Sequence, residues 1–318
     1  QALGNIKAMQ WFTDHGMEVM GATAGQTRWV LMPQEESNME NIRSFAVSSI
    51  DSGLNGLLLT LWDDDSPHFE LYMRGILAFA EYSWIGDKRS KDEIKSAFRQ
   101  REYGYTLADN NEAFITELES PVAFWKNALL KKNQRNFLHQ MKDPLEEAVI
   151  DFPDKENIGA WSLANEERLK TAAETLSQTD SIAKKIENAR SLALRNDHNL
   201  QVYEQVNKLA GYSPKMLLAL RDYDKAESRE DIMATASKLK ELESEFGSLR
   251  RELETVYSKT RILNKPDNYI LDQDHHVHLA NQSLNFDWQF YAEILFFKKL
   301  KQELAKEIYM ENADPLKK

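Results

Sequence analysis

An aromatic residue and three acids follow directly on one apolar segment of the chain. The run Leu57 to Leu61 is continuous and apolar, which is typical of a strand buried on both faces of a parallel sheet. It ends at Trp62, and Asp63, Asp64 and Asp65 come next. Ligands of parallel α/β folds bind at the carboxyl ends of the strands. We therefore expect substrate to bind at this segment.

The chemistry of this segment suits a sugar. A flat indole beside carboxylates offers an apolar surface to the sugar ring and hydrogen-bond acceptors to its hydroxyl groups. A solvated acidic loop and a bound cation are the alternatives for the three aspartates. His68 and Glu70 follow in the same loop and could orient the ligand or the loop. For His68, we favour a hydrogen bond that fixes the loop.

A second loop follows the preceding expected strand. It runs from Thr23 to Trp29 and holds small residues, an amide, the guanidinium of Arg28 and the indole of Trp29. It should lie beside the Trp62 loop if the two strands are neighbours. A plain loop with a packing tryptophan is an equal alternative. Gly21 and Gly25 do not form a phosphate-binding pattern, which excludes a nucleotide site of that kind.

Three of the seven histidines stand within four residues, at His275, His276 and His278. Strand-like alternation would place the last two on one face, and Asp272 or Asp274 could add oxygen ligands. No partner residues with zinc spacing accompany them. We interpret them as structural histidines and expect neither a metal nor another cofactor.

The elements that must position these residues alternate along the first part of the chain. They are a helix up to about Asp14, strand Met17–Thr23, helix Met39–Ser52, the strand before Trp62, and helix Phe69–Trp84. This order predicts parallel strands with helical crossovers. Two strands do not form a stable sheet alone. We therefore expect them to pair with a missing portion, or to be the last two βα units of a larger barrel.

Glycine usage changes where this alternation ends. Eight of the 12 glycines lie within residues 1–86, and the remainder of the chain is helical in pattern. The fold class is thus α/β followed by all-α, with domains at residues 1–86 and 87–318. The expected helices are 92–102, 110–132, 166–195, 200–226 with interruptions at Gly211 and Pro214, 229–261 and 288–310, and a polar, proline-containing stretch covers 142–161.

One of these helices carries a coiled-coil pattern. Between Arg229 and Arg261, apolar residues follow a spacing of three and four with charged residues between them. They are Ile232, Leu239, Leu242, Phe246, Leu249, Leu253 and Val256. The stripe predicts either an intramolecular hairpin with Glu166–Arg195 or a seam between two copies of the chain.

Composition narrows the classes of function. The chain has 318 residues, 42% of them hydrophobic, which is enough for two domains with cores. A net charge of -11 argues against nucleic-acid binding. The absence of cysteine excludes disulfides and thiolate chemistry.

No apolar run could span a membrane and no signal peptide stands at the start, so we expect a soluble protein of the cytoplasm or periplasm. The chain opens at Gln1 within an amphipathic segment, and we interpret it as a fragment.

Two segments carry a resemblance to a known family. Gly56 to Asp64 and Ala78 to Trp84 resemble the closing strand and helix of glycoside hydrolase family 20, the β-N-acetylhexosaminidases. There the last barrel strand ends in Trp-x-acid and the next helix carries Ala-x-Ala-Glu-x-x-Trp. The segments Gly21 to Gly25 and Tyr269 to His278 resemble the branch with a large helical extension.

The resemblance implies a TIM barrel that cleaves terminal β-linked N-acetylglucosamine or N-acetylgalactosamine by substrate-assisted retention. The catalytic Asp-Glu pair of such enzymes would lie upstream of this chain, which alone should be inactive. Trp62 would be the platform under the sugar and Asp64 an acceptor for its outer hydroxyls, although many members have Glu there, preceded by a neutral residue. The implied substrate-binding set is Trp62, Asp63, Asp64, Trp29, Arg28, His68 and Glu70.

The partners that we expect are an N-acetylhexosamine-containing glycan, the missing N-terminal part of the barrel and a second copy of the helical domain. Two other functions stay open. A non-catalytic carbohydrate-binding or dimerising module would explain the coiled-coil pattern. A metal-dependent hydrolase would use His275, His276 and His278.

Overall fold

The computed structural model of the chain describes residues 6–25, 31–62, 69–104, 113–131, 135–266 and 286–313. The chain divides into two compact units: unit 1 consists of residues 1–119 and 182–204, and unit 2 of residues 120–181 and 205–318. Most of the described residues are helical, as expected for a largely helical chain. The boundary that we expect after residue 86 concerns a change of fold type, and it stays a prediction.

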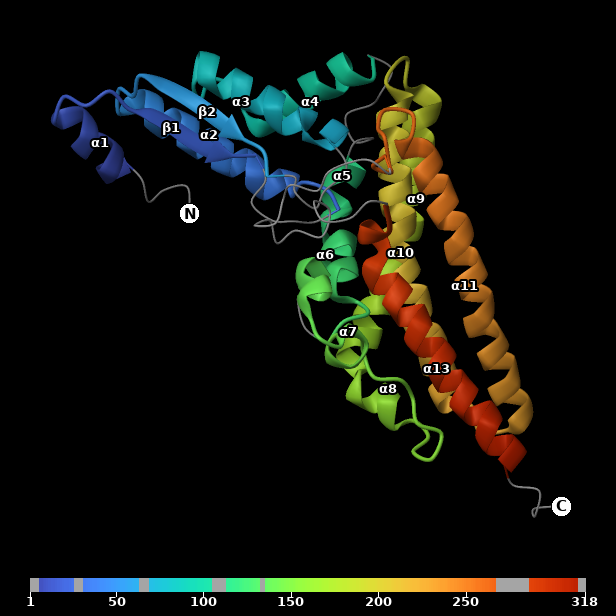
Figure 1. Cartoon of the computed structure of the whole chain (residues 1–318). Helices are drawn as coiled ribbons and strands as arrows, with labels where there is room; N and C mark the ends of the chain where they lie inside the picture. The colour runs from blue at the N-terminus through green and yellow to red at the C-terminus, as the bar shows by residue number, and fades with distance from the viewer. Residues whose placement is uncertain are drawn as a thin grey trace. The chain divides into compact units, whose positions relative to one another are not determined.

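Unit 1 contains a parallel two-stranded sheet with helices between and after its strands (Figure 1). Strand β1 pairs with β2 in the register Met20↔Gly56 to Ala24↔Thr60, which confirms the expected parallel neighbours. The elements in order are α1 (Ile6–Asp14), β1 (Met20–Ala24), α2 (Glu35–Asp51), β2 (Gly56–Thr60), the 3-10 helix η2 (Phe69–Tyr72), α3 (Met73–Ile85), α4 (Lys91–Glu102) and α5 (Ala113–Glu117).

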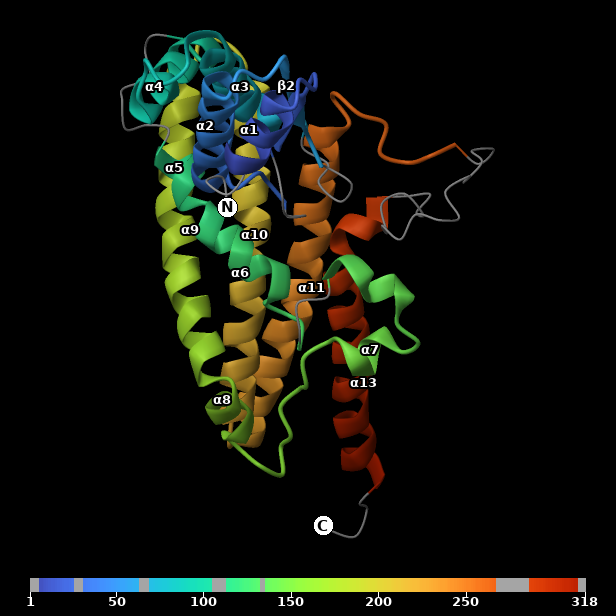
Figure 2. The ribbon, with the colours of Figure 1, turned by 90° about the vertical axis from the view of Figure 1, so that its left-hand side faces the viewer.

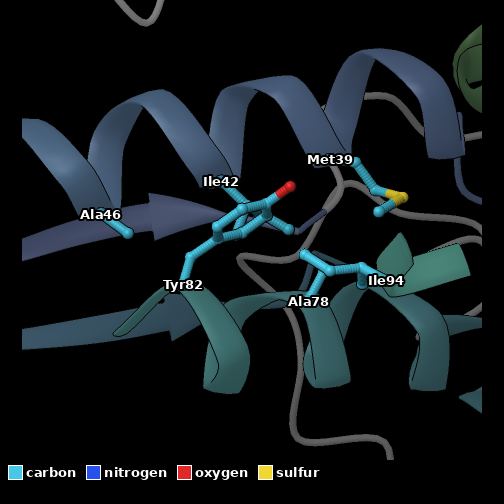
Figure 3. Packing of buried hydrophobic residues seen from close by; sticks show 6 residues of the cluster. All are labelled: Met39, Ile42, Ala46, Ala78, Tyr82 and Ile94. Carbon is cyan, nitrogen blue, oxygen red and sulfur yellow. The ribbon is translucent and has the colours of Figure 1, made fainter. Parts of the chain in front are cut away.

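The core of the sheet region lies between α2, α3 and α4. Figure 3 shows Tyr82 reaching from α3 toward α2, where it packs with buried apolar side chains of all three helices. Leu57 and Leu59 of β2 pack against this core from the sheet. The cluster consists of Met39, Ile42, Ala46, Ala78, Tyr82 and Ile94. Burial of this apolar surface holds the sheet to its helices.

The opposite face of the sheet is uncovered in the described part of the chain. Met20 is 63% exposed and Leu58 is 51% exposed, whereas Gly21 and Thr23 are buried. The expectation that Leu57 to Leu61 is buried on both faces is therefore wrong for this chain. Successive side chains of a strand point to opposite faces, and the core of α2, α3 and α4 covers only one of them.

The elements of unit 2 are helical, apart from an antiparallel bridge between Leu130 and Val149. Two long helices, α9 (Glu166–Leu192) and α10 (Asp197–Lys225), contribute to both units. The other elements are α6 (Glu119–Asn127), η3 (Arg135–Gln140), α7 (Pro144–Glu147), α8 (Ala160–Ala164), α11 (Arg229–Tyr257), η4 (Phe286–Phe290) and α13 (Tyr291–Ala313). None of the helices in the described ranges combines the length and apolar character needed to cross a membrane.

Helix α10 continues through two residues at which the sequence predicts interruptions. It passes Gly211 and contains Pro214 inside its span. A Cβ atom at Gly211 would lie 2.8 Å from the Thr179 hydroxyl oxygen on α9. The glycine therefore permits a close approach of the two helices and does not end one of them. The helix expected over 110–132 was also wrong in detail, because the structure has two shorter helices, α5 and α6.

Helix α11 lies beside α10 and α13 (Figure 2), and its apolar stripe from Leu239 to Val256 is buried inside unit 2. The ring centroid of Phe246 lies 5.6 Å from those of Tyr212, Phe290 and Phe297. The Tyr212 hydroxyl also donates a hydrogen bond to the carbonyl of Leu242. These contacts place the stripe against α10, η4 and α13. The stripe is thus covered within the chain, but by these elements and not by the expected partner Glu166–Arg195. An apolar stripe alone does not specify which helix covers it.

A buried ion pair connects three elements of unit 2. Glu293 on α13 is fully buried and accepts hydrogen bonds from both terminal nitrogens of Arg135, at 2.9 and 3.1 Å. The Trp125 indole N–H donates to the same carboxylate at 3.0 Å, and the guanidinium lies 3.8 Å from the Trp125 ring centroid. A buried carboxylate with a bidentate partner and a third donor has its desolvation offset.

Removal of a side chain from the covered face of the sheet should destabilise the chain. Ile42→Ala is expected to lower the free energy of unfolding by about 2–5 kcal/mol, because it leaves a cavity in the core. Leu58→Ala, on the uncovered face, should change it by less than about 0.5 kcal/mol. Equilibrium urea denaturation of both variants measures the difference. Equal losses would contradict the assignment of the two faces.

Removal of the buried carboxylate should cost more than removal of an exposed one. Glu293→Ala leaves Arg135 buried without its partner and should lower the free energy of unfolding by about 3–5 kcal/mol. The matched control is Glu252→Ala, whose pair with Lys208 lies at the surface with a side chain that is 53% exposed and is worth about 0–1 kcal/mol. Urea denaturation distinguishes the two. A loss at Glu293 no larger than that at Glu252 would refute a structural role for the buried pair.

Candidate functional site

The carboxyl ends of the two strands lie side by side and carry the exposed indole of Trp62. Ala24 pairs with Thr60 as the last residues of β1 and β2, and the Gly25 N–H donates to the Thr60 carbonyl at 2.8 Å. A Cβ atom at Gly25 would lie 2.8 Å from Leu61, so the glycine allows the strand ends to stay close. Trp62 follows two residues after β2 and is 55% exposed. The structure thus places Trp62 at the edge of the sheet where the sequence predicts a ligand.

A chain of hydrogen bonds fixes the indole at this edge. The Trp62 indole N–H donates to the Thr60 hydroxyl oxygen at 3.1 Å, and that hydroxyl donates to the Thr23 carbonyl, also at 3.1 Å. Asn41 on α2 donates from its side-chain amide to the Thr23 hydroxyl at 2.9 Å and to the Ala24 carbonyl at 3.3 Å. We call Asn41, Thr23, Thr60 and Trp62 the strand-end network. Because the indole N–H is engaged within it, the ring surface is the part of Trp62 offered to a ligand.

Glu70 follows the Trp62 loop along the chain, in η2. Its carboxylate is partly buried and stands 3.9 Å from the imidazole Nε2 of His198, at the start of α10 and within unit 1. Tyr72 and Arg74, which follow on the same segment, are almost fully buried. The structure therefore places Glu70 beside His198, and its role in the loop or toward a ligand stays a prediction. The sequence gives no signal for His198, because the contact joins residues that are distant along the chain.

The remaining expected site residues lie outside the described residues. They are Arg28, Trp29, Asp63, Asp64, Asp65 and His68, together with His275, His276 and His278 of the histidine cluster. Their gathering around Trp62 stays a prediction. Within the part of the chain that the structure describes, no group of three potential ligands could hold a metal ion.

Charged side chains hold α2 in place beside the strand-end network. Glu36 on α2 accepts hydrogen bonds from Lys91 at 2.7 Å and from Lys95 at 2.5 Å, both on α4. These two hydrogen bonds, that of Lys91 foremost, lower the pKa of Glu36 to about 2. Because Asn41 lies on the same helix, the pairing of α2 with α4 also stabilises the position from which Asn41 reaches the strands.

Tyr82 illustrates a perturbed group without a chemical role. Burial raises the pKa of its phenol to about 12, so the side chain is neutral at physiological pH. It belongs to the core cluster of α2, α3 and α4, where it packs with apolar side chains. A perturbed pKa identifies a functional group only when a suitable site accompanies it.

Comparisons with known proteins give only weak structural similarity. No family model matches the chain, and no curated protein matches it. The solved structure of a GH138 enzyme targeting pectin rhamnogalacturonan II is similar, with a TM-score of 0.44 and 11% sequence identity. The match covers 95% of this chain and 49% of that chain, so this chain spans about half the length of that structure. At this level, the similarity assigns neither fold nor function.

The comparisons overturn the assignment to glycoside hydrolase family 20. No family model matches, and the similar structure belongs to a different glycoside hydrolase family. The assignment rested on two short segments, Gly56 to Asp64 and Ala78 to Trp84. An apolar strand that ends in an aromatic and an acid, followed by an alanine-rich helix, satisfies the packing needs of many βα units. The expectation of a β-N-acetylhexosaminidase was therefore wrong.

The pairing of Glu36 should make the stability of the chain pH-dependent. The pKa of Glu36 is lowered from 4.5 to about 2 in the folded protein, so its contribution is complete above pH 4.5 and is lost as the pH falls toward 2. We expect the urea midpoint of the unchanged chain to exceed that of Glu36→Gln above pH 4.5. The difference should shrink between pH 4.5 and 2. A difference that does not vary with pH would contradict this account.

Proposed function

We propose that the carboxyl edge of β1 and β2 binds a carbohydrate and that the chain is part of a glycoside hydrolase. The observation that carries the proposal is Trp62, whose indole is 55% exposed while its N–H is held by Thr60. A sugar ring has a face of C–H groups that packs on an aromatic surface. An indole whose N–H is already bonded offers its ring face for that contact.

The residues around Trp62 in the sequence supply the polar part of the proposed site. Asp63 and Asp64 follow it directly, and their carboxylates would accept hydrogen bonds from sugar hydroxyls. We include Arg28, Trp29 and His68 as further contacts, because their loops follow the ends of the same two strands. Glu70 would act by holding the loop, through its position opposite His198.

We further propose that β1 and β2 belong to a larger parallel sheet of the (β/α)8 barrel type. The uncovered face that carries Met20 and Leu58 supports this, because parallel sheets are normally covered on both faces. In a barrel, helices cover the outer face and side chains of the other strands fill the interior. Glycoside hydrolases usually protonate the leaving oxygen with a carboxylic acid. We place that proton donor on the remaining strands, so this chain alone should not hydrolyse glycosides.

The alternative of a helical binding or dimerising module has lost one of the observations that suggested it, the apolar stripe. The apolar stripe of α11 is buried against α10, η4 and α13 inside unit 2. Dimerisation of the helical part remains a prediction without a described surface that favours it. Sugar binding by unit 2 would be recognisable, because ligand-induced changes would then appear on residues of unit 2 rather than at Trp62.

Trp62 should respond to a sugar, and its removal should weaken sugar binding. We expect the indole N–H signal of Trp62 to shift when methyl glycosides of a neutral hexose, a deoxyhexose, a uronic acid and an N-acetylhexosamine are titrated at millimolar concentration. Trp62→Ala should weaken binding of the responding glycoside by about 1–3 kcal/mol through lost apolar contact. Nitrogen–proton NMR spectra of the labelled chain provide the measurement.

The chain offers a matched control in Trp84, which lies on α3 and is 89% exposed. Trp84→Ala should leave glycoside binding unchanged. The proposal fails if no glycoside shifts the Trp62 signal. It also fails if the Trp84 variant loses binding to the same extent as the Trp62 variant.

A further inference from the structure

Asn41 occupies an unusual place for a residue in the middle of a helix. It lies on α2, between buried apolar residues of the core, yet its side chain reaches the ends of the sheet. Resting on the function proposed above, we infer that Asn41 is a positioning residue for the sugar platform. It acts on Trp62 through Thr23 and Thr60 and touches no ligand itself.

The Asn41 amide, the Thr60 hydroxyl and the Trp62 indole N–H all donate to acceptors at the strand ends. The Asn41 amide has two N–H donors, and both are used, one by the Thr23 hydroxyl and one by the Ala24 carbonyl. The Thr60 hydroxyl donates to the Thr23 carbonyl and is left with lone pairs that accept the Trp62 indole N–H. Asn41 therefore holds the end of β1 at two points, the Thr23 hydroxyl and the Ala24 carbonyl. Thr60 transmits that position to the indole.

Side chains of similar shape test each hydrogen bond of the network separately. An aspartate at position 41 has the shape of asparagine but would bring a carboxylate against the Ala24 carbonyl, where two acceptors repel. A valine at position 60 has the shape of threonine but accepts nothing from the indole. A serine at position 60 keeps the hydroxyl. These three substitutions separate the hydrogen bonds from the packing of the strands.

The network restricts the motion of the exposed Trp62 side chain before a ligand binds. A large side chain that must be immobilised on binding loses conformational entropy, and a side chain that is already fixed does not. Loss of one neutral hydrogen bond corresponds to about a threefold to tenfold change in an equilibrium. We therefore expect Thr60→Val to weaken binding of the responding methyl glycoside by about threefold to tenfold.

The experiment measures the network separately from the sugar. Hydrogen exchange of the Trp62 indole N–H in the unliganded chain reports its bond to Thr60. Titration with the four methyl glycosides reports binding. Thr60→Val should accelerate the exchange and weaken binding, Thr60→Ser should restore both, and Asn41→Asp should accelerate the exchange by a smaller factor. Thermal unfolding of each variant, followed by circular dichroism, ensures that folded chains are compared.

The outcomes distinguish this inference from the proposed function. Unchanged indole exchange in either Thr60→Val or Asn41→Asp, or failure of Thr60→Ser to restore it, overturns the role of the network. Accelerated exchange with unchanged glycoside affinity overturns the positioning role as well. If the unchanged chain binds none of the glycosides, the proposed function fails instead, and the exchange data then show only whether Asn41 holds the indole.

Discussion

A parallel strand requires hydrogen-bonded neighbours at its edges and apolar cover on both faces, and this requirement governs unit 1. Strands β1 and β2 pair with each other and receive cover from the core of α2, α3 and α4 on one face. The other face, with Met20 and Leu58, is uncovered in the described part of the chain. Helices α2 and α3 pack where they cover the apolar side chains of the first face. The proposal of a larger sheet follows from the uncovered one.

The same requirement explains why the strand-end network lies at one end of the strands. The ladder of backbone hydrogen bonds fixes Ala24 beside Thr60, and the chain must leave the sheet beyond them. Side chains at that point stand on a backbone held by the ladder and can reach solvent, and a binding site needs both properties. Thr23 and Thr60 are polar residues within an apolar sheet, and each finds its partners at this end.

The sequence predicted the parts of unit 1 that depend on local pattern. Alternation of apolar segments and turns identified both strands, and the position of Trp62 after an apolar run identified the edge. Asn41 could not be found in this way, because its role depends on a contact between α2 and β1. The prediction at Gly211 failed for a related reason. A glycine that serves close packing against Thr179 looks, in sequence, the same as one that ends a helix.

The engaged N–H of the Trp62 indole has a stereochemical consequence for the proposed site. An indole with a free N–H can recognise a hydroxyl in its plane, whereas this one has given that bond to Thr60. Its discrimination between sugars would then depend on the ring face alone. Epimers that present an unbroken row of axial C–H bonds on one side would be preferred to those with an axial hydroxyl there, because the hydroxyl would lose its water without gaining a partner.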